Sequence, residues 1–502
     1  MSKSYSDYMN EISADELYKG LLAYGLFNEK LPPVFTSEPF YNYAPIQPFS
    51  DKPHGFIFHE SMRDINIPRS LGIPNPMAYQ RLCECLKDNW TEIQSRFERQ
   101  TNGDSHKISR VHIRKQKGTE ALFKMNYKNW RTDDLPVPDI LIGKKYMVSA
   151  DISTCFPSMY THSLCWALVG KDTAKNNRNR TLWFNELDHR CMNLRSNETH
   201  GFLIGPHASN LLSEIILTVV DSELGKKWDY VRNIDDYTCY VDSYEKAREF
   251  LTDIGTQLRR FDLSLNHRKT KIELLPVAST RQWVRQLNTF DLATAYGKVD
   301  FKKAQAYLDL AVALMEENNG NAAVLNYAIK VLSKRKLTKN ARNYTLKTIM
   351  HFAVIYPYLI PLLDEYIFKP LAAPKEDVEC FSNIVFNNAA EEKNYEALIY
   401  AIFFSLTYDF DISGISAALA IQENSCLLKI FTWIYFNRRK KRDEIKALKK
   451  HARDLSQNEN DLDENWLFIY EVLPQSDLKN EWKPMKKANV SFIKQEFRDV
   501  KP

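Results

Sequence analysis

Two patterns of apolar residues divide this 502-residue chain near residue 280. Before that point, short strand-like runs such as Tyr146–Ala150 alternate with helical stretches, for example the one that follows Gly205-Pro206. Beyond it only helical periodicity remains, as over Tyr307–Met315 and Val324–Leu332. The pattern therefore predicts an α+β half followed by an all-helical half.

The helical half is interrupted at Asn318-Asn319-Gly320 and near Pro374 and Asn424. Paired helices that recur about every forty residues are typical of an α-solenoid of the HEAT-like kind. No clean sequence repeat accompanies them. We expect a helical solenoid domain over residues 281–502.

The first hundred residues are predicted to begin with a helix and to continue as extended segments. Ser13-Ala14-Asp15-Glu16 is a capping box, so a helix should begin there and end before Pro32. Residues 33–75 are rich in Pro, Phe and Tyr and lack helical period, which predicts extended loops. A helix-rich stretch follows over 76–99, and we assign residues 1–100 to the same lobe as 101–280.

Three aspartates lie at the end of, or within, predicted strands. Asp151 directly follows the run Tyr146–Ala150, whereas Asp235 and Asp236 stand together inside a second strand-like segment. Each of them alone would more often be a helix-capping or exposed turn residue. The ordered set, with the glycine turn at Gly205 between them and Lys269 after them, favours a shared site.

Carboxylates in this arrangement suit metal-assisted nucleotidyl transfer. Such a reaction uses two divalent cations, one to activate the attacking hydroxyl and one to hold the triphosphate. Mg²⁺ prefers oxygen ligands and is held by a few carboxylates together with substrate phosphates. Adjacent strand residues point to opposite faces, so Asp235 and Asp236 can share a site only if a tight turn brings one back. We expect two Mg²⁺ ions, with Mn²⁺ as an alternative.

A basic hairpin is predicted over residues 109–125, with its turn at Lys117-Gly118. It carries Arg110, Arg114, Lys115 and Lys124, and cations so placed could hold an incoming triphosphate. A solvated basic hairpin is the alternative. Arg114 and Lys124 are the preferred nucleotide-binding candidates.

Composition says more about the cellular compartment of the protein than about its binding partner. The formal net charge of +5 is weak evidence for nucleic acid, and eight cysteines without zinc-ligand spacing suggest free thiols in a reducing environment. The N-terminus lacks the apolar core of a signal peptide, and the longest apolar runs are too short to span a bilayer. We expect a cytoplasmic protein with no membrane partner. The basic run 438–450 is either a solvated helix face or a phosphate-binding surface.

The aspartate segments resemble the sequence motifs of reverse transcriptases. Asp151–Phe156 is similar to motif A, Gly205-Pro206 with Ser209 to motif B, Arg232–Asp236 to motif C, and Leu263–Thr270 to motif D. One departure is that Asn233 stands where motif C usually has tyrosine. The resemblance implies a palm and fingers over residues 101–280, with Asp151, Asp235 and Asp236 as catalytic metal ligands. It also implies that Phe156 excludes a 2′-hydroxyl and that Gly205 and Lys269 contact the nucleotide.

A narrower resemblance is to the abortive-infection (Abi) polymerases of bacteria, of the AbiK-like, prophage-borne type. It covers about residues 20–275 and includes Leu22–Phe27, Leu31–Pro33 and Phe40–Tyr43. The resemblance implies an antiphage DNA polymerase that joins deoxynucleotides without a template and is primed by a protein tyrosine. It further implies a single-stranded DNA product attached covalently to the protein, and a homo-oligomer, for which we expect a trimer.

The priming tyrosine must reach the three aspartates. The proline-bounded stretch Pro39–Pro45 contains Tyr41 and Tyr43, and these are the first candidates; Tyr5 and Tyr8, near the terminus, are the reserve candidates. Anchoring of a loop is the ordinary alternative for each.

Two rival functions stay open. One is a templated reverse transcriptase of the retron or group II intron type, against which the long helical half argues. The other is a non-catalytic nucleic-acid-binding scaffold, against which the intact carboxylates and Lys269 argue.

Overall fold

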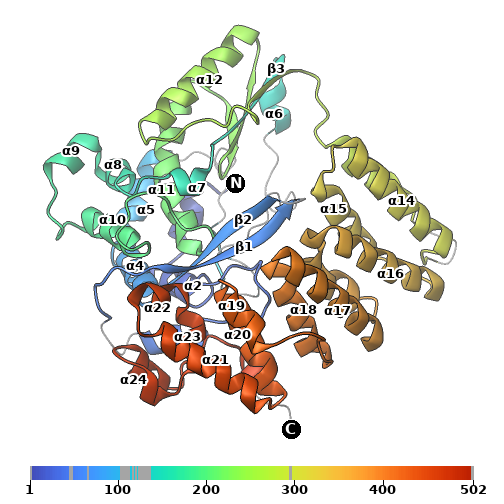
Figure 1. Cartoon of the computed structure of the whole chain (residues 1–502). Helices are drawn as coiled ribbons and strands as arrows, with labels where there is room; N and C mark the ends of the chain where they lie inside the picture. The colour runs from blue at the N-terminus through green and yellow to red at the C-terminus, as the bar shows by residue number, and fades with distance from the viewer. Residues whose placement is uncertain are drawn as a thin grey trace.

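The computed structural model describes residues 3–44, 49–64, 67–101, 113–115, 118, 121–122, 137–292 and 297–498. Figure 1 shows an α+β half with the sheet of β3 at one end of the molecule, and a helical half whose helices α14 to α18 run along one side and whose helices α19 to α24 lie at the opposite end. The described part of the chain has no helix with the length and apolarity needed to cross a bilayer.

The N-terminal segment folds as helices around one long hairpin. Its elements are α1 (Tyr5–Asn10), α2 (Ala14–Leu22), α3 (Glu38–Tyr43), β1 (Phe56–Asp64), β2 (Ile67–Pro74), α4 (Pro76–Asp88) and α5 (Trp90–Thr101). The Ser13/Glu16 capping box is confirmed, because each side chain bonds the other residue's backbone N–H. The prediction of loops over 33–75 is wrong: α3 and the antiparallel β1–β2 hairpin fill most of it.

The palm-like region surrounds a four-stranded antiparallel sheet in the order β4-β5-β3-β6. Its strands are β3 (Tyr146–Asp151), β4 (Tyr230–Asn233), β5 (Asp236–Val241) and β6 (Lys271–Leu274). Its helices are α6 (Val137–Leu141), α7 (Cys155–Ser158), α8 (Ser163–Val169), α9 (Lys171–Asn176), α10 (Trp183–Asn193), α11 (His207–Leu224) and α12 (Tyr244–Arg259). The predicted helix after Gly205-Pro206 is α11, and the Ser243 side chain caps α12 by accepting a hydrogen bond from the Lys246 N–H.

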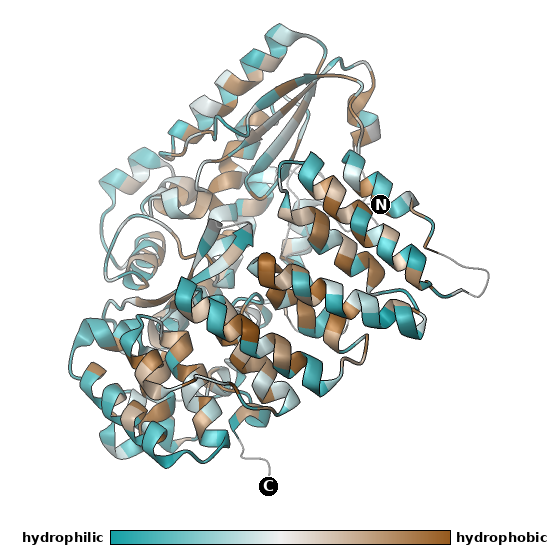
Figure 2. Ribbon diagram, turned by 45° about the vertical axis from the view of Figure 1, so that its right-hand side comes forward, coloured by the Kyte–Doolittle hydropathy of each residue, from teal (hydrophilic) through white to brown (hydrophobic). Residues whose placement is uncertain are grey.

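The remaining elements are all helical, as the periodicity predicted. They are α13 (Gln282–Thr289), α14 (Phe301–Glu317), α15 (Ala322–Leu332), α16 (Lys339–Ile355), η2 (Pro357–Leu362), η3 (Asp364–Phe368), α17 (Lys375–Glu392), α18 (Tyr395–Tyr408), α19 (Ala417–Gln422), α20 (Cys426–Arg438), α21 (Arg442–Leu455), α22 (Glu459–Glu464), α23 (Trp466–Val472), η4 (Gln475–Asp477), α24 (Trp482–Lys487) and α25 (Gln495–Arg498). Successive helices pack side by side, and their apolar residues face one another in Figure 2.

Buried polar contacts join the two halves. Glu396 of α18 accepts a hydrogen bond from the Met62 backbone N–H of β1 at 2.7 Å, and burial raises the pKa of this carboxyl to about 7. The Tyr400 hydroxyl donates to the Lys30 carbonyl at 2.9 Å. Asp463 accepts from the Gly55 N–H at 2.8 Å. The β1–β2 hairpin is therefore held by the helical half as well as by the palm-like region.

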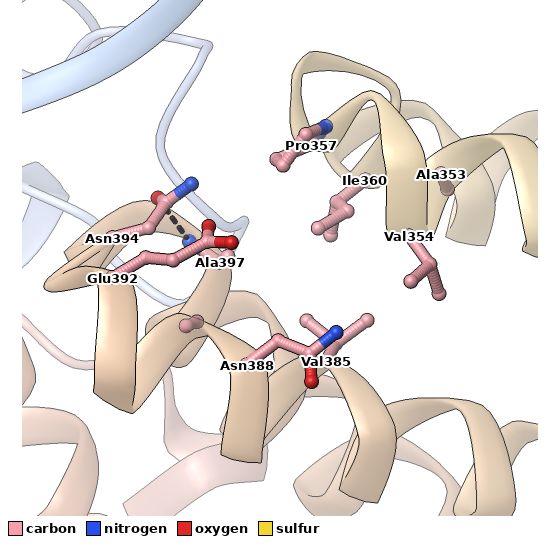
Figure 3. A pocket seen from close by; sticks show the side chains of 10 residues that line it. Ala353, Val354, Pro357, Ile360, Val385, Asn388, Glu392, Asn394 and Ala397 are labelled. Atoms are coloured by element: carbon pink, nitrogen blue, oxygen red, sulfur yellow. Dashed lines mark hydrogen bonds between the residues drawn. The ribbon is translucent and has the colours of Figure 1, made fainter. Parts of the chain in front are cut away.

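Figure 3 shows a hollow between α16, η2, α17 and α18. Its floor is apolar, with Val354, Ile360 and Val385, and Asn394 at its rim caps α18 by accepting from the Ala397 N–H at 3.1 Å. It is a packing feature between helix pairs and brings together no cluster of titratable groups.

Candidate functional site

Strand pairing brings two of the three aspartates together. Asp151 at the end of β3 lies opposite Asp236 at the start of β5. Asp235 occupies the turn between β4 and β5, next to Ile234, whose φ of 55° lies in the left-handed region. The Ile152 backbone N–H donates to the Asp235 carbonyl at 3.1 Å, which fixes the turn against the end of β3. The tight turn required by the adjacent aspartates is therefore present.

The three carboxylates perturb one another. Burial and the charges of Asp235 and Asp151 raise the pKa of Asp236 to about 6, and burial followed by the charge of Asp151 raises the pKa of Asp235. Each of these shifts means that another negative charge is unfavourable in this site. A bound cation would relieve the repulsion, which is the electrostatic condition that a metal site requires.

Asp151 is held by the segment that follows α12. The Lys269 ammonium donates to its Oδ2 at 2.6 Å, the Asn266 amide to its Oδ1 at 3.1 Å, and the Asn266 backbone N–H to its carbonyl at 2.7 Å. Lys269 is half exposed, whereas Asp151 is buried. The segment that resembles motif D and the strand end that resembles motif A are thus in direct contact.

A buried arginine on β4 stabilises the β4–β5 hairpin. Arg232 of β4 is fully buried and donates to Glu214 at 2.8 and 3.0 Å and to Asp221 at 2.7, 2.9 and 3.1 Å. Its Nη1 also donates to the Ile234 carbonyl at 2.9 Å, inside the turn that carries Asp235. Burial acts to lower the pKa of Arg232, but the two carboxylates outweigh it and raise that pKa well above its usual value. Sequence reasoning missed this network, although Glu214 and Asp221 lie two turns apart on the otherwise apolar face of α11.

The donor set fits hard divalent cations. Oxygen atoms of Asp151, Asp235 and Asp236 are the ligand type that Mg²⁺ takes, and substrate phosphates commonly complete such a shell. Among the described residues, no three His, Cys, Asp or Glu side chains are grouped so that they could hold a metal ion. The carboxylates therefore supply the ligand type of a divalent cation, with Lys269 in contact with Asp151, but they do not form a ready metal-holding group.

The predicted basic hairpin lies largely outside the described residues, Lys124 and Arg110 included. Within the described part, the Arg114 backbone N–H donates to the Leu122 carbonyl at 3.0 Å, and Lys115 forms a 2.7 Å ion pair with Glu16. A different hairpin contributes a positive charge to the site: burial and Asp151 raise the pKa of Asp235, and the charge of Arg69 on β2 opposes that rise in small part. Arg69 was missed because its strand was predicted to be a loop.

The glycine turn lies against the same β1–β2 hairpin. The Gly72 N–H donates to the Ile204 carbonyl at 2.8 Å. Gly205 has φ of 135°, and a Cβ there would lie 3.0 Å from the Gly72 carbonyl oxygen. Gly205 therefore permits both this backbone shape and the close approach of β2.

Phe156 lies one turn after Asp151, on α7. Its ring is half buried against the core, and its carbonyl accepts from the Phe202 N–H at 2.8 Å. Asn233, in the place of the motif C tyrosine, keeps a buried side-chain oxygen for which the described part of the chain offers no hydrogen-bond partner.

The tyrosine candidates occupy different surroundings. Tyr5 is buried, and its hydroxyl donates to Glu214 at 2.9 Å; burial raises the pKa of this hydroxyl well above its usual value. Tyr43 is buried beside Phe49, whereas Tyr41 is half buried against Tyr18 and Tyr8 is half buried on α1. Tyr41 and Tyr43 belong to the helix α3 and not to an extended loop.

Comparisons with known proteins give only distant neighbours. No family model matches the chain, and no curated protein does. Three solved structures that align are an apo telomerase from Candida tropicalis truncated from its C-terminal domain, a telomerase from Candida albicans in complex with a fragment of telomeric RNA, and an apo telomerase from Candida tropicalis. In the same order, identities are 14%, 10% and 11%, and TM-scores are 0.31, 0.30 and 0.32. The alignments cover 48%, 70% and 72% of this chain and 54%, 64% and 71% of the telomerases. Similarity at this level supports no conclusion about activity.

Proposed function

We propose that this chain is a bacterial antiphage DNA polymerase of the reverse-transcriptase type, which joins deoxynucleotides without a template from a protein tyrosine. The observation that carries the nucleotidyl-transfer part is the pairing of Asp151 with Asp236, with Asp235 in the adjoining turn. The template-free and tyrosine-primed parts rest on the resemblance to abortive-infection polymerases.

The residues around the cluster have distinct roles in this proposal. Asp151, Asp235 and Asp236 would hold two Mg²⁺ ions, which when bound activate the attacking hydroxyl and neutralise the triphosphate. Arg69 and Lys269 lie beside the carboxylates and would pair with phosphate oxygens. Arg232 acts through the hairpin and positions the turn that carries Asp235.

The proposal is tested with purified full-length protein, Mg²⁺ and labelled deoxynucleotides, in the absence of added nucleic acid. We expect labelled DNA that stays with the protein after denaturation and is released by protease. Product sequences that copy a supplied RNA would instead support the templated alternative. Absence of any incorporation, with each of several divalent ions, would support the scaffold alternative.

The sugar preference is expected to depend on Phe156. Replacing it by Ala should open space beneath the 2′ position, so incorporation of ribonucleotides relative to deoxynucleotides should rise about tenfold or more, which corresponds to about 1.4 kcal/mol of discrimination. Competition assays with paired ribo- and deoxynucleotides measure this ratio. A ratio equal to that of the wild-type protein would place sugar selection elsewhere.

Loss of one tyrosine hydroxyl should remove the covalent DNA. We expect one Tyr→Phe change among Tyr41, Tyr43, Tyr8 and Tyr5 to abolish the adduct and to leave deoxynucleotide binding intact. The half-buried Tyr41 and Tyr8 are the more accessible pair, whereas Tyr5 and Tyr43 would have to leave the core. Mass spectrometry of nuclease-trimmed protein locates the nucleotide, and its presence on none of the four contradicts this choice.

A further inference from the structure

The basic run 438–450 separates into structural and exposed residues. Arg438 donates to the carbonyls of Leu406 and Glu496, both at 2.6 Å, and Arg439 pairs with Asp411 at 2.5 Å. These two arginines tie α20 to its neighbours. Lys440 and Lys441 lie between α20 and α21, and the later cations of the run lie on α21.

Five cations of α21 share one side of the helix: Arg442, Lys446, Lys449, Lys450 and Arg453. At 3.6 residues per turn they fall within about a third of the helix circumference and extend over about 17 Å. We call this set the α21 basic stripe. Four of the five are exposed and Lys449 is partly buried. Arg453 pairs with Asp477 at 2.6 Å, and no ion pair is recorded for the other four in the described part of the chain.

The stripe differs from an ordinary solvated helix face. Such faces usually carry both signs of charge at i and i+4, where opposite charges stabilise the helix. Here Arg442 and Lys446, Lys446 and Lys450, and Lys449 and Arg453 are like-charged i, i+4 pairs, which disfavour the helix. Asp443 and Asp454 lie at one edge of the stripe only, where Asp443 is three residues before Lys446 and Asp454 is four residues after Lys450.

The opposite side of α21 is already occupied. Leu448 and Ala452 are buried, and the helix packs against α19, α20 and α23. An amphipathic helix that lies on a membrane needs a free apolar face, and α21 has none. The partner that fits is a soluble polyanion with closely spaced charges.

We propose that the α21 basic stripe binds the phosphate backbone of single-stranded DNA, without regard to base sequence. The stripe contains no aromatic side chain on which a base could stack, so contact is with phosphates alone. Figure 1 shows α21 at the end of the molecule opposite the sheet of β3, so this surface is separate from the candidate catalytic site. The strand would be the product of the proposed polymerase; the choice of single-stranded DNA among phosphate polyanions rests on the proposed function, whereas the binding of phosphates rests on the charge of the stripe.

The test measures binding of labelled oligodeoxythymidine to full-length protein by fluorescence anisotropy, without deoxynucleotides, at several salt concentrations. Arg442→Gln/Lys446→Gln/Lys449→Gln/Lys450→Gln should weaken binding about tenfold or more and reduce the salt slope by roughly 0.7 for each lost phosphate contact. The control Lys302→Gln/Lys339→Gln/Lys375→Gln/Lys479→Gln removes the same charge from scattered exposed sites of the helical half. It should change binding less than about twofold.

The melting temperature of the stripe variant should be unchanged or higher, because like-charged neighbours are removed. Equal weakening by both variants, or weakening by neither, overturns the proposal. Retained binding to anionic vesicles together with no DNA binding overturns it as well. Because no nucleotide is added, this result is independent of whether the protein polymerises.

Discussion

Replacing any one of Asp151, Asp235 and Asp236 by Asn should lower deoxynucleotide incorporation by about a thousandfold or more. The substitution keeps the shape of the side chain and removes a metal-binding charge, and metal ions supply several kcal/mol of transition-state stabilisation in such reactions. The fold should survive: Asp235→Asn and Asp236→Asn also remove a repulsion that raises the pKa of both groups, so their melting temperatures should be unchanged or higher.

The matched control is Asp229→Asn. Asp229 precedes β4, its side chain is 72% exposed, and it lies 3.7 Å from Lys144. Its substitution should leave incorporation within about twofold of wild type, as surface changes generally do. Incorporation at the wild-type rate by all three cluster variants would show that the carboxylates hold no catalytic metal.

The second large effect is expected at Arg232. Arg232→Met should destabilise the fold by about 3–5 kcal/mol, because it leaves Glu214 and Asp221 buried without a cation. Incorporation should fall too, since the turn that carries Asp235 loses its hydrogen bond from Arg232. Urea unfolding followed by tyrosine and tryptophan fluorescence measures the first effect, and the labelled-nucleotide assay measures the second.

Two further variants separate charge burial from simple loss of a cation. Lys227 also pairs with two carboxylates, Glu249 and Asp253, but it is half exposed, so Lys227→Met should destabilise the fold far less than Arg232→Met does. Adding Glu214→Gln and Asp221→Asn to Arg232→Met should restore part of the stability, because no unpaired charge is then buried. Equal costs for Lys227→Met and Arg232→Met would contradict the importance assigned to the buried network.

The proximity of the three aspartates could be predicted from sequence because it depends on where two strands end. Asp151 ends an apolar run and Asp235-Asp236 interrupts another, so strand pairing alone brings them together. Helix starts were also predictable, since the capping residues Ser13 and Ser243 act on backbone groups three residues away.

The β1–β2 hairpin and the buried charge network of Arg232 could not be predicted from sequence pattern. On the inward face of β1, His59 and Ser61 are buried beside Ile57, so the apolar alternation that marks a strand is broken. Arg232 was assigned to a motif, but its burial depends on Glu214, Asp221 and the Tyr5 hydroxyl, which come from distant parts of the chain. Sequence pattern describes one element at a time, whereas burial of a charge depends on which elements meet.

The contact between Lys269 and Asp151 affects how a divalent ion would enter the site. With its ammonium 2.6 Å from Oδ2, Lys269 already balances part of the negative charge that would attract a divalent ion. A metal ion that bound Asp151 would exchange one cation for another, and the displaced ammonium would become available to phosphates bound with the ion. One of the three carboxylates is thus paired before any ion binds, and the negative charge that a divalent ion would neutralise is mainly that of Asp235 and Asp236.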